Sequence, residues 1–177
     1  MRGTPAYEIV LEDCHVPKED LLGQEGTGFS LGLQVFDRSR PYDAILAVGI
    51  ADGALQYAVD YAKERKQFGR PIADFQGIQF MLADMAIQLE AARQLVYKAA
   101  VLIDQGSPFI TKFSSMANCF ATDMGVKVTN DAMQILGGYG YIKDHPLEQK
   151  MRDARLLQIV EGTNQIQRVV VARRILS

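Results

Sequence analysis

A single carboxylate near the C-terminus is the first residue whose setting could do chemistry. Glu161 stands in the stretch QIVEGTNQIQ, after an apolar pair and before a glycine and small polar residues. Burial among apolar neighbours would raise the pKa of such a carboxyl group and make it a stronger base. A solvated loop glutamate is the other interpretation of the same residue.

Two further stretches could bind a ligand. RKQFGRPI, residues 65–72, follows a predicted helix. Its arginine could grip a phosphate with Gln67 and Phe68 beside it, or its cations could only complement the helix dipole. QILGGYGY, residues 134–141, has glycines that would let the backbone approach a ligand closely or would simply end a helix. It does not open a helix after a strand, so the dinucleotide-binding argument does not apply.

The composition indicates one globular domain and excludes several classes of function. The chain has 177 residues, of which 48% are apolar, and its net charge is -2. That charge predicts no nucleic-acid partner, and the apolar runs are shorter than the roughly 20 residues of a membrane span, so no membrane insertion is expected. Cys14 and Cys119 match no metal or redox spacing, which indicates two reduced thiols, no metal and a cytoplasmic protein.

The elements that must position these residues differ between the two ends of the chain. Residues 1–26 contain AYEIVLEDCHVP, which predicts one strand or two. Since an isolated strand or hairpin is unstable in water, this segment is expected to be the remnant of a sheet domain. From Gly28 onward the apolar spacing becomes helical, and residues 27–177 are expected to form a helical domain.

The helical part is expected to be an antiparallel four-helix-type bundle, so the predicted fold class is mainly α with a short N-terminal β remnant. A short helix should stop at Pro41, with Ser39 as the cap of a new start that runs to a turn at residues 69–71. Apolar residues at steps of three and four predict helices over 78–99, 113–135 and 147–157. The last helix should start at Asn164 as its cap, with Gln167 three residues on.

Three stretches together resemble the acyl-CoA dehydrogenase family, in that family's order and spacing. They are RGTPAYEIVLEDCHVP, ERKQFGRPIADFQGIQFMLADMA and QILGGYGYIKDHPLEQKMRDARLLQIVEGTNQIQ. Members of that family have a helical domain, a β domain and a C-terminal helical bundle. The resemblance covers essentially the whole chain and implies that it corresponds to the last strands of the β domain plus the bundle. Well over half of the usual length is then expected before it.

The resemblance implies a chemistry for Glu161. These enzymes oxidise an acyl-CoA thioester to the 2-enoyl-CoA: a glutamate takes a proton from the α-carbon and FAD accepts a hydride from the β-carbon. Glu161 would be that base, and Gly162 would leave room for the thioester. Stabilisation of enolate character by the backbone N–H of the glutamate and a flavin hydroxyl would make the α-proton more acidic.

The resemblance also implies a set of binding residues. The positions expected to contact FAD are Arg65, Gln67, Phe68, Gln76, Gln134, Gly137, Gly138, Thr163 and Gln165. Several of these reach the cofactor of a neighbouring subunit in the family, which predicts a homo-oligomer built as a dimer of dimers. Arg40 would lie near the base, and Asp37 would contact the CoA portion or cap a helix. The expected electron acceptor is an electron-transfer flavoprotein, in the cytoplasm or, in a eukaryote, the mitochondrial matrix.

One departure from the family pattern leaves the substrate open. Many members have tyrosine before the glutamate, where this chain has Val160, so the wall of the acyl pocket differs. Acyl chain length and branching are therefore not predicted. Two other interpretations remain: an acyl-CoA oxidase, and a non-catalytic module that forms the helical core of an oligomer.

Overall fold

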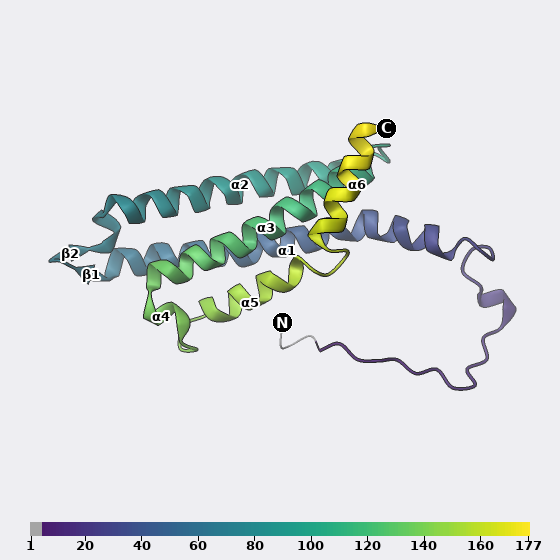
Figure 1. Ribbon diagram of the computed structural model, residues 1–177, viewed down its shortest axis with the longest axis horizontal. Helices are drawn as coiled ribbons and strands as arrows, with labels where there is room; N and C mark the ends of the chain where they lie inside the picture. Colours follow the sequence, from purple (N-terminus) through teal and green to yellow (C-terminus); the bar gives the residue numbers. More distant parts are fainter. Residues whose placement is uncertain (1–4) are drawn as a thin grey trace.

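The computed structural model describes residues 5–177 and is dominated by long helices (Figure 1). The helices are α1 (Gly28–Glu64), α2 (Gln76–Asp104), α3 (Ile110–Leu136), α4 (Gly138–Tyr141), α5 (Leu147–Leu157) and α6 (Asn164–Leu176). Short 3-10 turns lie at Lys18–Asp20 and Ile72–Asp74, and the strands β1 (Lys66–Gln67) and β2 (Arg70–Pro71) pair antiparallel. Consecutive long helices reverse direction, so α1, α2, α3 and α5 form the predicted antiparallel bundle with α6 lying across one end.

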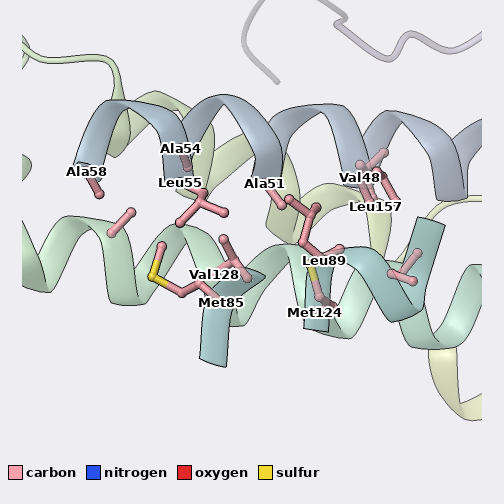
Figure 2. Close-up of a cluster of buried hydrophobic side chains, with 14 of the residues drawn as sticks. Val48, Ala51, Ala54, Leu55, Ala58, Met85, Leu89, Met124, Val128 and Leu157 are labelled. Atoms are coloured by element: carbon pink, nitrogen blue, oxygen red, sulfur yellow. The ribbon is translucent and has the colours of Figure 1, made fainter. Parts of the chain in front are cut away.

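The core of the bundle is built largely from alanine. On α1 six alanines have no exposed surface: Ala44, Ala47, Ala51, Ala54, Ala58 and Ala62. Figure 2 shows part of this row with Leu55 above Val128 of α3 and Met85 of α2. Small side chains let helix axes approach closely, and the longer side chains of the partners fill the space between them. This packing makes α1 a fixed frame for the polar side chains on its other faces.

Pro41 does not interrupt α1, so the prediction of two separate helices there is wrong. Proline has no N–H to donate to the carbonyl four residues earlier, which belongs to Asp37. The Oγ of Ser114 on α3 donates to that carbonyl oxygen at 2.6 Å. Because a side chain of another helix satisfies the Asp37 carbonyl oxygen, α1 continues through Pro41 and reaches a total length of 37 residues.

The strand predicted near the N-terminus is also absent. No residue between 5 and 27 is in a strand, and Tyr7 and Ile9 are more than four-fifths exposed. In Figure 1 the segment runs as a loop outside the bundle. A strand needs a neighbouring strand for its hydrogen bonds, and the two strands found within residues 5–177, β1 and β2, pair with each other. The division into residues 1–26 and 27–177 stays a prediction.

The helix predictions nearest the C-terminus hold, apart from one cap. α2, α3 and α5 confirm the predicted helices over 78–99, 113–135 and 147–157. The cap of α6 is Thr163, whose Oγ1 accepts from the N–H of Ile166 at 3.4 Å, and not Asn164. Asn164 is instead buried and donates to Thr122 and Asp123 of α3, which ties the start of α6 to the bundle. Within residues 5–177, no helix combines the length and the apolar character needed to cross a membrane.

Candidate functional site

Glu161 lies on a turn whose backbone is unusual. The turn occupies residues 158–163, between α5 and α6. The φ angle of Glu161 is 56° and that of Gly162 is 95°, both in the left-handed region. Glycine adopts this region without steric strain, whereas for a residue with a side chain the region costs about 1–2 kcal/mol. The positive φ of Glu161 is therefore held by its surroundings.

Side chains from two helices hold the turn. The buried amide of Gln167 on α6 donates from Nε2 to the carbonyl oxygens of Glu161 at 3.1 Å and Gly162 at 2.9 Å. Arg40 of α1 donates from Nε to the same Glu161 carbonyl at 3.3 Å. A Cβ at position 162 would lie 3.1 Å from Nε2 of Gln167, so glycine also suits the close approach of that amide.

The carboxylate of Glu161 is positioned by a residue that the sequence did not identify for this role. Ser39 of α1 donates a hydrogen bond from Oγ to Oε2 of Glu161. Ser39 was expected to cap a helix, but it lies inside α1 because Pro41 does not end the helix. Glu161 is half-buried, so its side chain is held against α1 and does not extend freely into solvent.

Arg40 links this carboxylate to the rest of the bundle. Its side chain is buried, and Nη1 donates to Oδ1 of Asp37 at 3.1 Å and to Oγ of Ser115 at 3.3 Å. Burial lowers the pKa of Arg40, and the negative charges of Asp37 and Glu161 act in the opposite direction. Asp37 also accepts from Oγ1 of Thr111 at 2.6 Å. Asp37 thus lies within α1 and orients Arg40, which excludes the alternative that it caps a helix.

A cation-rich cavity adjoins Arg40 and Asp37. Its volume is about 330 Å³, and its lining residues come from α1, α3 and the C-terminal end of α6: Leu33, Asp37, Arg40, Thr111, Val170, Arg173, Arg174 and Ser177. Three guanidinium groups around one cavity favour an anionic ligand. Arg173 and Arg174 were not predicted as binding residues, because cations in the last turn of a helix are common and nothing in their spacing marks a site.

A second cavity brings together five of the residues expected to bind the cofactor. Its volume is about 540 Å³, and its lining includes Arg65, Gln67, Gln134, Gly137 and Gly138. These residues come from the end of α1, from β1, and from the junction of α3 and α4.

The junction at Gly137 and the position of Arg65 shape this second cavity. Gly137 has φ 60°, which allows the sharp turn between α3 and α4. The guanidinium of Arg65 lies 5.7 Å from the ring centroid of Tyr139, which also lines the cavity. A guanidinium, two amides and closely spaced glycine backbone are suited to a phosphate or nucleotide group.

The other expected cofactor residues lie elsewhere. Phe68 is 92% exposed at the tip of the β1–β2 hairpin, and Gln76 is exposed at the start of α2. Thr163 and Gln165 line a third cavity of about 340 Å³ with Arg155 and other polar residues of α3, α5 and α6. Figure 1 shows the hairpin and α4 at one end of the bundle and α6 at the other. The expected cofactor residues therefore form two separated groups.

The described residues contain no group of three or more His, Cys, Asp or Glu side chains that could hold a metal ion. At Glu161, a half-buried carboxylate is fixed through one oxygen, and the buried arginine that supports its backbone, Arg40, lines the cation-rich cavity. A carboxylate held in one position is a group that can act as a general base.

Comparison with known proteins identifies the family. Residues 26–176 match the family model described as acyl-CoA dehydrogenase, C-terminal domain. The probable acyl-CoA dehydrogenase FadE25 of Mycobacterium tuberculosis is 49% identical over 99% of this chain and 45% of its own length. The butyryl-CoA dehydrogenase of Megasphaera elsdenii superposes with a TM-score of 0.93 at 46% identity, over 95% of this chain and 44% of that one.

Another similar chain belongs to a structure described as the electron transferring flavoprotein of Acidaminococcus fermentans. It superposes with a TM-score of 0.92 at 54% identity, and the match covers 94% of this chain and 44% of the other. The chain spans about half the length of the curated relatives it matches. The matched region begins where α1 is about to start and ends with α6, so it contains the helical bundle and the turn that carries Glu161. The chain belongs to the acyl-CoA dehydrogenase family, of which it carries the C-terminal helical domain.

Proposed function

We propose that this chain supplies the catalytic base of an FAD-dependent acyl-CoA dehydrogenase, which oxidises the bond between the α- and β-carbons of an acyl-CoA thioester. The observation that carries the proposal is the setting of Glu161. Its carboxylate sits on a turn fixed from α1 and α6. Arg40, which bonds to the carbonyl oxygen of Glu161, also lines a cavity together with Arg173 and Arg174. The family resemblance selects this residue, and its fixed geometry fits a group that must meet one carbon atom.

Glu161 would remove the α-proton of the substrate. The α-proton of a thioester is weakly acidic, so the base must be held close to it and the enolate charge must be stabilised. Ser39 and Arg40 hold the side chain and the backbone of Glu161 in one position. The backbone N–H of the same residue is suited to donate to the thioester carbonyl. Bound FAD would supply the acceptor for the hydride that leaves the β-carbon.

The cation-rich cavity would hold the anionic part of the CoA moiety. Coenzyme A carries phosphate groups some distance from its thioester sulfur, so its binding site must extend away from the base. The cavity runs from Arg40, which bonds to the Glu161 carbonyl, to Arg173 and Arg174 near the end of α6. Arginine binds phosphate oxygens through charge-assisted hydrogen bonds, which fits this assignment.

The two separated groups of cofactor residues support a homo-oligomer. Thr163 and Gln165 lie on the Glu161 side of the bundle, while Arg65, Gln67 and Gln134 line the cavity at the other end. A cofactor bound near Glu161 would be completed by the second group from another copy of the chain. We therefore propose a dimer of dimers in which each copy contributes both groups, with an electron transferring flavoprotein as the electron acceptor.

The test is optical and uses the natural full-length polypeptide. The purified protein is expected to be yellow, and an acyl-CoA from a panel of graded length and branching should bleach the flavin absorbance. Glu161→Gln keeps the size of the side chain and removes its basicity, so it should still bind the acyl-CoA but bleach at least about 100-fold more slowly. A folded, oligomeric protein that is colourless and remains so when FAD is added would overturn the proposal in favour of a non-catalytic module.

An oxygen assay separates the dehydrogenase from the acyl-CoA oxidase interpretation. A dehydrogenase reduced by substrate should stay bleached for minutes in air-saturated buffer and recover its colour when an electron transferring flavoprotein is added. Rapid recovery in air with stoichiometric hydrogen peroxide would assign the protein as an oxidase.

A further inference from the structure

Asp123 of α3 binds both ends of the turn that carries Glu161. Gln158, the first residue of the turn, donates from Nε2 to Oδ1 of Asp123 at 2.6 Å. Asn164, the first residue of α6, donates from Nδ2 to the same oxygen at 2.7 Å. The backbone N–H of Asn164 also donates to the carbonyl oxygen of Gln158 at 3.1 Å. The two ends of the turn are therefore joined to each other and to one atom of α3.

Glu161 lies at the midpoint of the segment that these contacts close. It is the third residue after Gln158 and the third before Asn164. Glu161 and Gly162 both have positive φ angles, and for Glu161 such an angle persists only where the surroundings hold it. A shift of either end reaches the middle of so short a segment, because few backbone torsions are available to absorb it. The separation of the two ends therefore contributes to the position of the Glu161 carboxylate.

The second oxygen of Asp123 orients the carboxylate for this task. Oδ2 accepts a hydrogen bond from Nη2 of Arg168 on α6. The Arg168 side chain is 58% exposed, so this ion pair contributes little stability by itself. Hydrogen bonds to an ionised acceptor are stronger than those between neutral groups, which favours the two bonds that Oδ1 accepts. The main structural effect of Asp123 is therefore the attachment of Gln158 and Asn164 to α3.

Asp123 would act on the base only through the turn. Among residues 5–177, its hydrogen-bond partners are Gln158, Asn164 and Arg168, and Glu161 is not one of them. The inference rests on the proposed function, in which Glu161 removes the α-proton. We propose that Asp123 is a positioning residue for this reaction, which closes the turn so that the Glu161 carboxylate meets the α-carbon of the acyl-CoA.

The test must separate positioning of the base from cofactor binding. Asp123 also lines the third cavity, together with Thr163 and Gln165, which were expected to contact FAD. A residue that only held FAD would change the flavin content of the protein. A residue that positions the base would change the rate of proton transfer in protein that is fully loaded with flavin.

The first measurement is flavin reduction in the natural full-length, flavin-loaded protein and in its Asp123→Ala variant. The substrate is the acyl-CoA of the panel above that bleaches the flavin fastest, mixed anaerobically in a stopped-flow spectrophotometer. The limiting rate should fall by roughly 10- to 100-fold, the loss expected when a base is misplaced by about 1 Å. The acyl-CoA concentration that gives half of the limiting rate should change by less than about threefold, because substrate binding is retained.

An isotope effect identifies the step that becomes slower. Acyl-CoA with deuterium at the α-carbon should reduce the flavin of Asp123→Ala more slowly than unlabelled acyl-CoA does. The ratio of the two rates should be at least as large as in the natural protein, because Asp123 supports the transfer of the α-proton to Glu161. A general loss of stability would lower the yield of folded yellow protein and leave this ratio unchanged. A ratio that falls to one would show that another step limits the variant, and the inference would be wrong.

Two further variants assign the effect to the contact with the turn. Gln158→Ala removes one of the two donors to Oδ1 and should also lower the limiting rate. In the Gln158→Ala background, Asp123→Ala should cost at least about threefold less than in the natural protein, because one of its bonds is already absent. Equal costs in both backgrounds would overturn the inference. Asp131→Ala is the matched control: it removes a carboxylate of α3 that pairs with Lys127 of the same helix, and it should leave the rate unchanged.

The outcomes separate this inference from the proposed function. If Asp123→Ala, once loaded with FAD, reduces its flavin as fast as the natural protein, the inference is wrong and the dehydrogenase assignment stands. If Asp123→Ala does not fold, Gln158→Ala decides, since it leaves Asp123 bonded to Asn164 and Arg168: a lower limiting rate supports the inference and an unchanged rate overturns it. If no acyl-CoA bleaches the natural protein, or if Glu161→Gln bleaches as fast, the proposed function fails and the inference fails with it.

Discussion

The continuity of α1 through Pro41 depends on one hydrogen bond from another helix, and its removal should be measurable. Ser114 is fully buried, and its Oγ lies 2.6 Å from the carbonyl oxygen of Asp37. In an ordinary helix that carbonyl would accept from the N–H of residue 41, which proline lacks. Ser114→Ala therefore leaves a helical carbonyl without a partner while changing the volume of the core very little.

The magnitude follows from the cost of an unsatisfied buried acceptor. Such a group costs about 1–3 kcal/mol, so Ser114→Ala should lower the free energy of unfolding by about 2 kcal/mol. For a protein of this size, each 1 kcal/mol corresponds to roughly 2–4 °C, so the Tm should fall by roughly 4–8 °C. Urea unfolding followed by far-UV circular dichroism measures the first quantity, and calorimetry measures the second.

A double-mutant cycle with Pro41→Ala makes the prediction specific. Alanine at position 41 supplies the missing N–H to Asp37, so the carbonyl no longer needs Ser114. The cost of Ser114→Ala should then fall below about 1 kcal/mol in the Pro41→Ala background. Equal costs in both backgrounds would show that Ser114 acts through packing alone, and the account of α1 given above would be refuted.

Three further predictions concern the Glu161 site. Gly162→Ala should lower the free energy of unfolding by about 1–2 kcal/mol, because a φ angle of 95° strains alanine and its Cβ would meet the Gln167 amide. Urea unfolding measures this difference, and equal stability of the two proteins would contradict the prediction. Asp43→Asn should become more stable relative to the natural protein as the pH rises above about 4. Burial and the negative charge of Glu161 raise the pKa of Asp43 in the folded state, so the unfolded chain loses the proton at lower pH than the folded chain does. Ionisation of Asp43 therefore lowers the free energy of unfolding of the natural protein, and asparagine cannot ionise. A stability difference that stays constant between pH 3 and 7 would be the opposite result. The double change Arg173→Gln with Arg174→Gln should weaken acyl-CoA binding about tenfold and make the affinity less dependent on salt. Titration calorimetry of the flavin-loaded protein measures both effects. An unchanged affinity would show that the cation-rich cavity does not bind CoA.

The helices were predictable where local signals sufficed. In α2 and α3, apolar residues recur at intervals of three and four residues. Gly106 and Pro108 follow the end of α2, and Gly137 follows the end of α3. Pro41 shows the limit of such signals. The sequence around it contains a helix breaker, and the compensating hydroxyl comes from Ser114, 77 residues after Asp37. Local patterns cannot contain a contact that exists only after α1 and α3 pack together.

The site was predictable only in part for the same reason. The motif around Glu161 and the family resemblance selected Glu161, Gly162 and Arg40, and the structure brings these three residues together. Ser39, which holds the carboxylate, was interpreted as a helix cap because its partner lies 122 residues away in the sequence. The predicted strand near the N-terminus failed in a related way, since a strand is defined by a neighbour that the described residues do not include.

The distribution of rigid and strained parts in this domain suits the role proposed for Glu161, because a base must be placed accurately. Asp37, Ser39, Arg40 and Asp43 all belong to α1, whose alanine row packs closely against α3 and fixes their positions. Glu161 belongs instead to a turn with two positive φ angles, which has little hydrogen-bonded secondary structure of its own. Bonds from Arg40 and Gln167 transfer the rigidity of the helices to that turn. Changes to those two side chains should therefore affect the position of the carboxylate, and with it the rate of proton transfer, far more than they affect the assembly of the bundle.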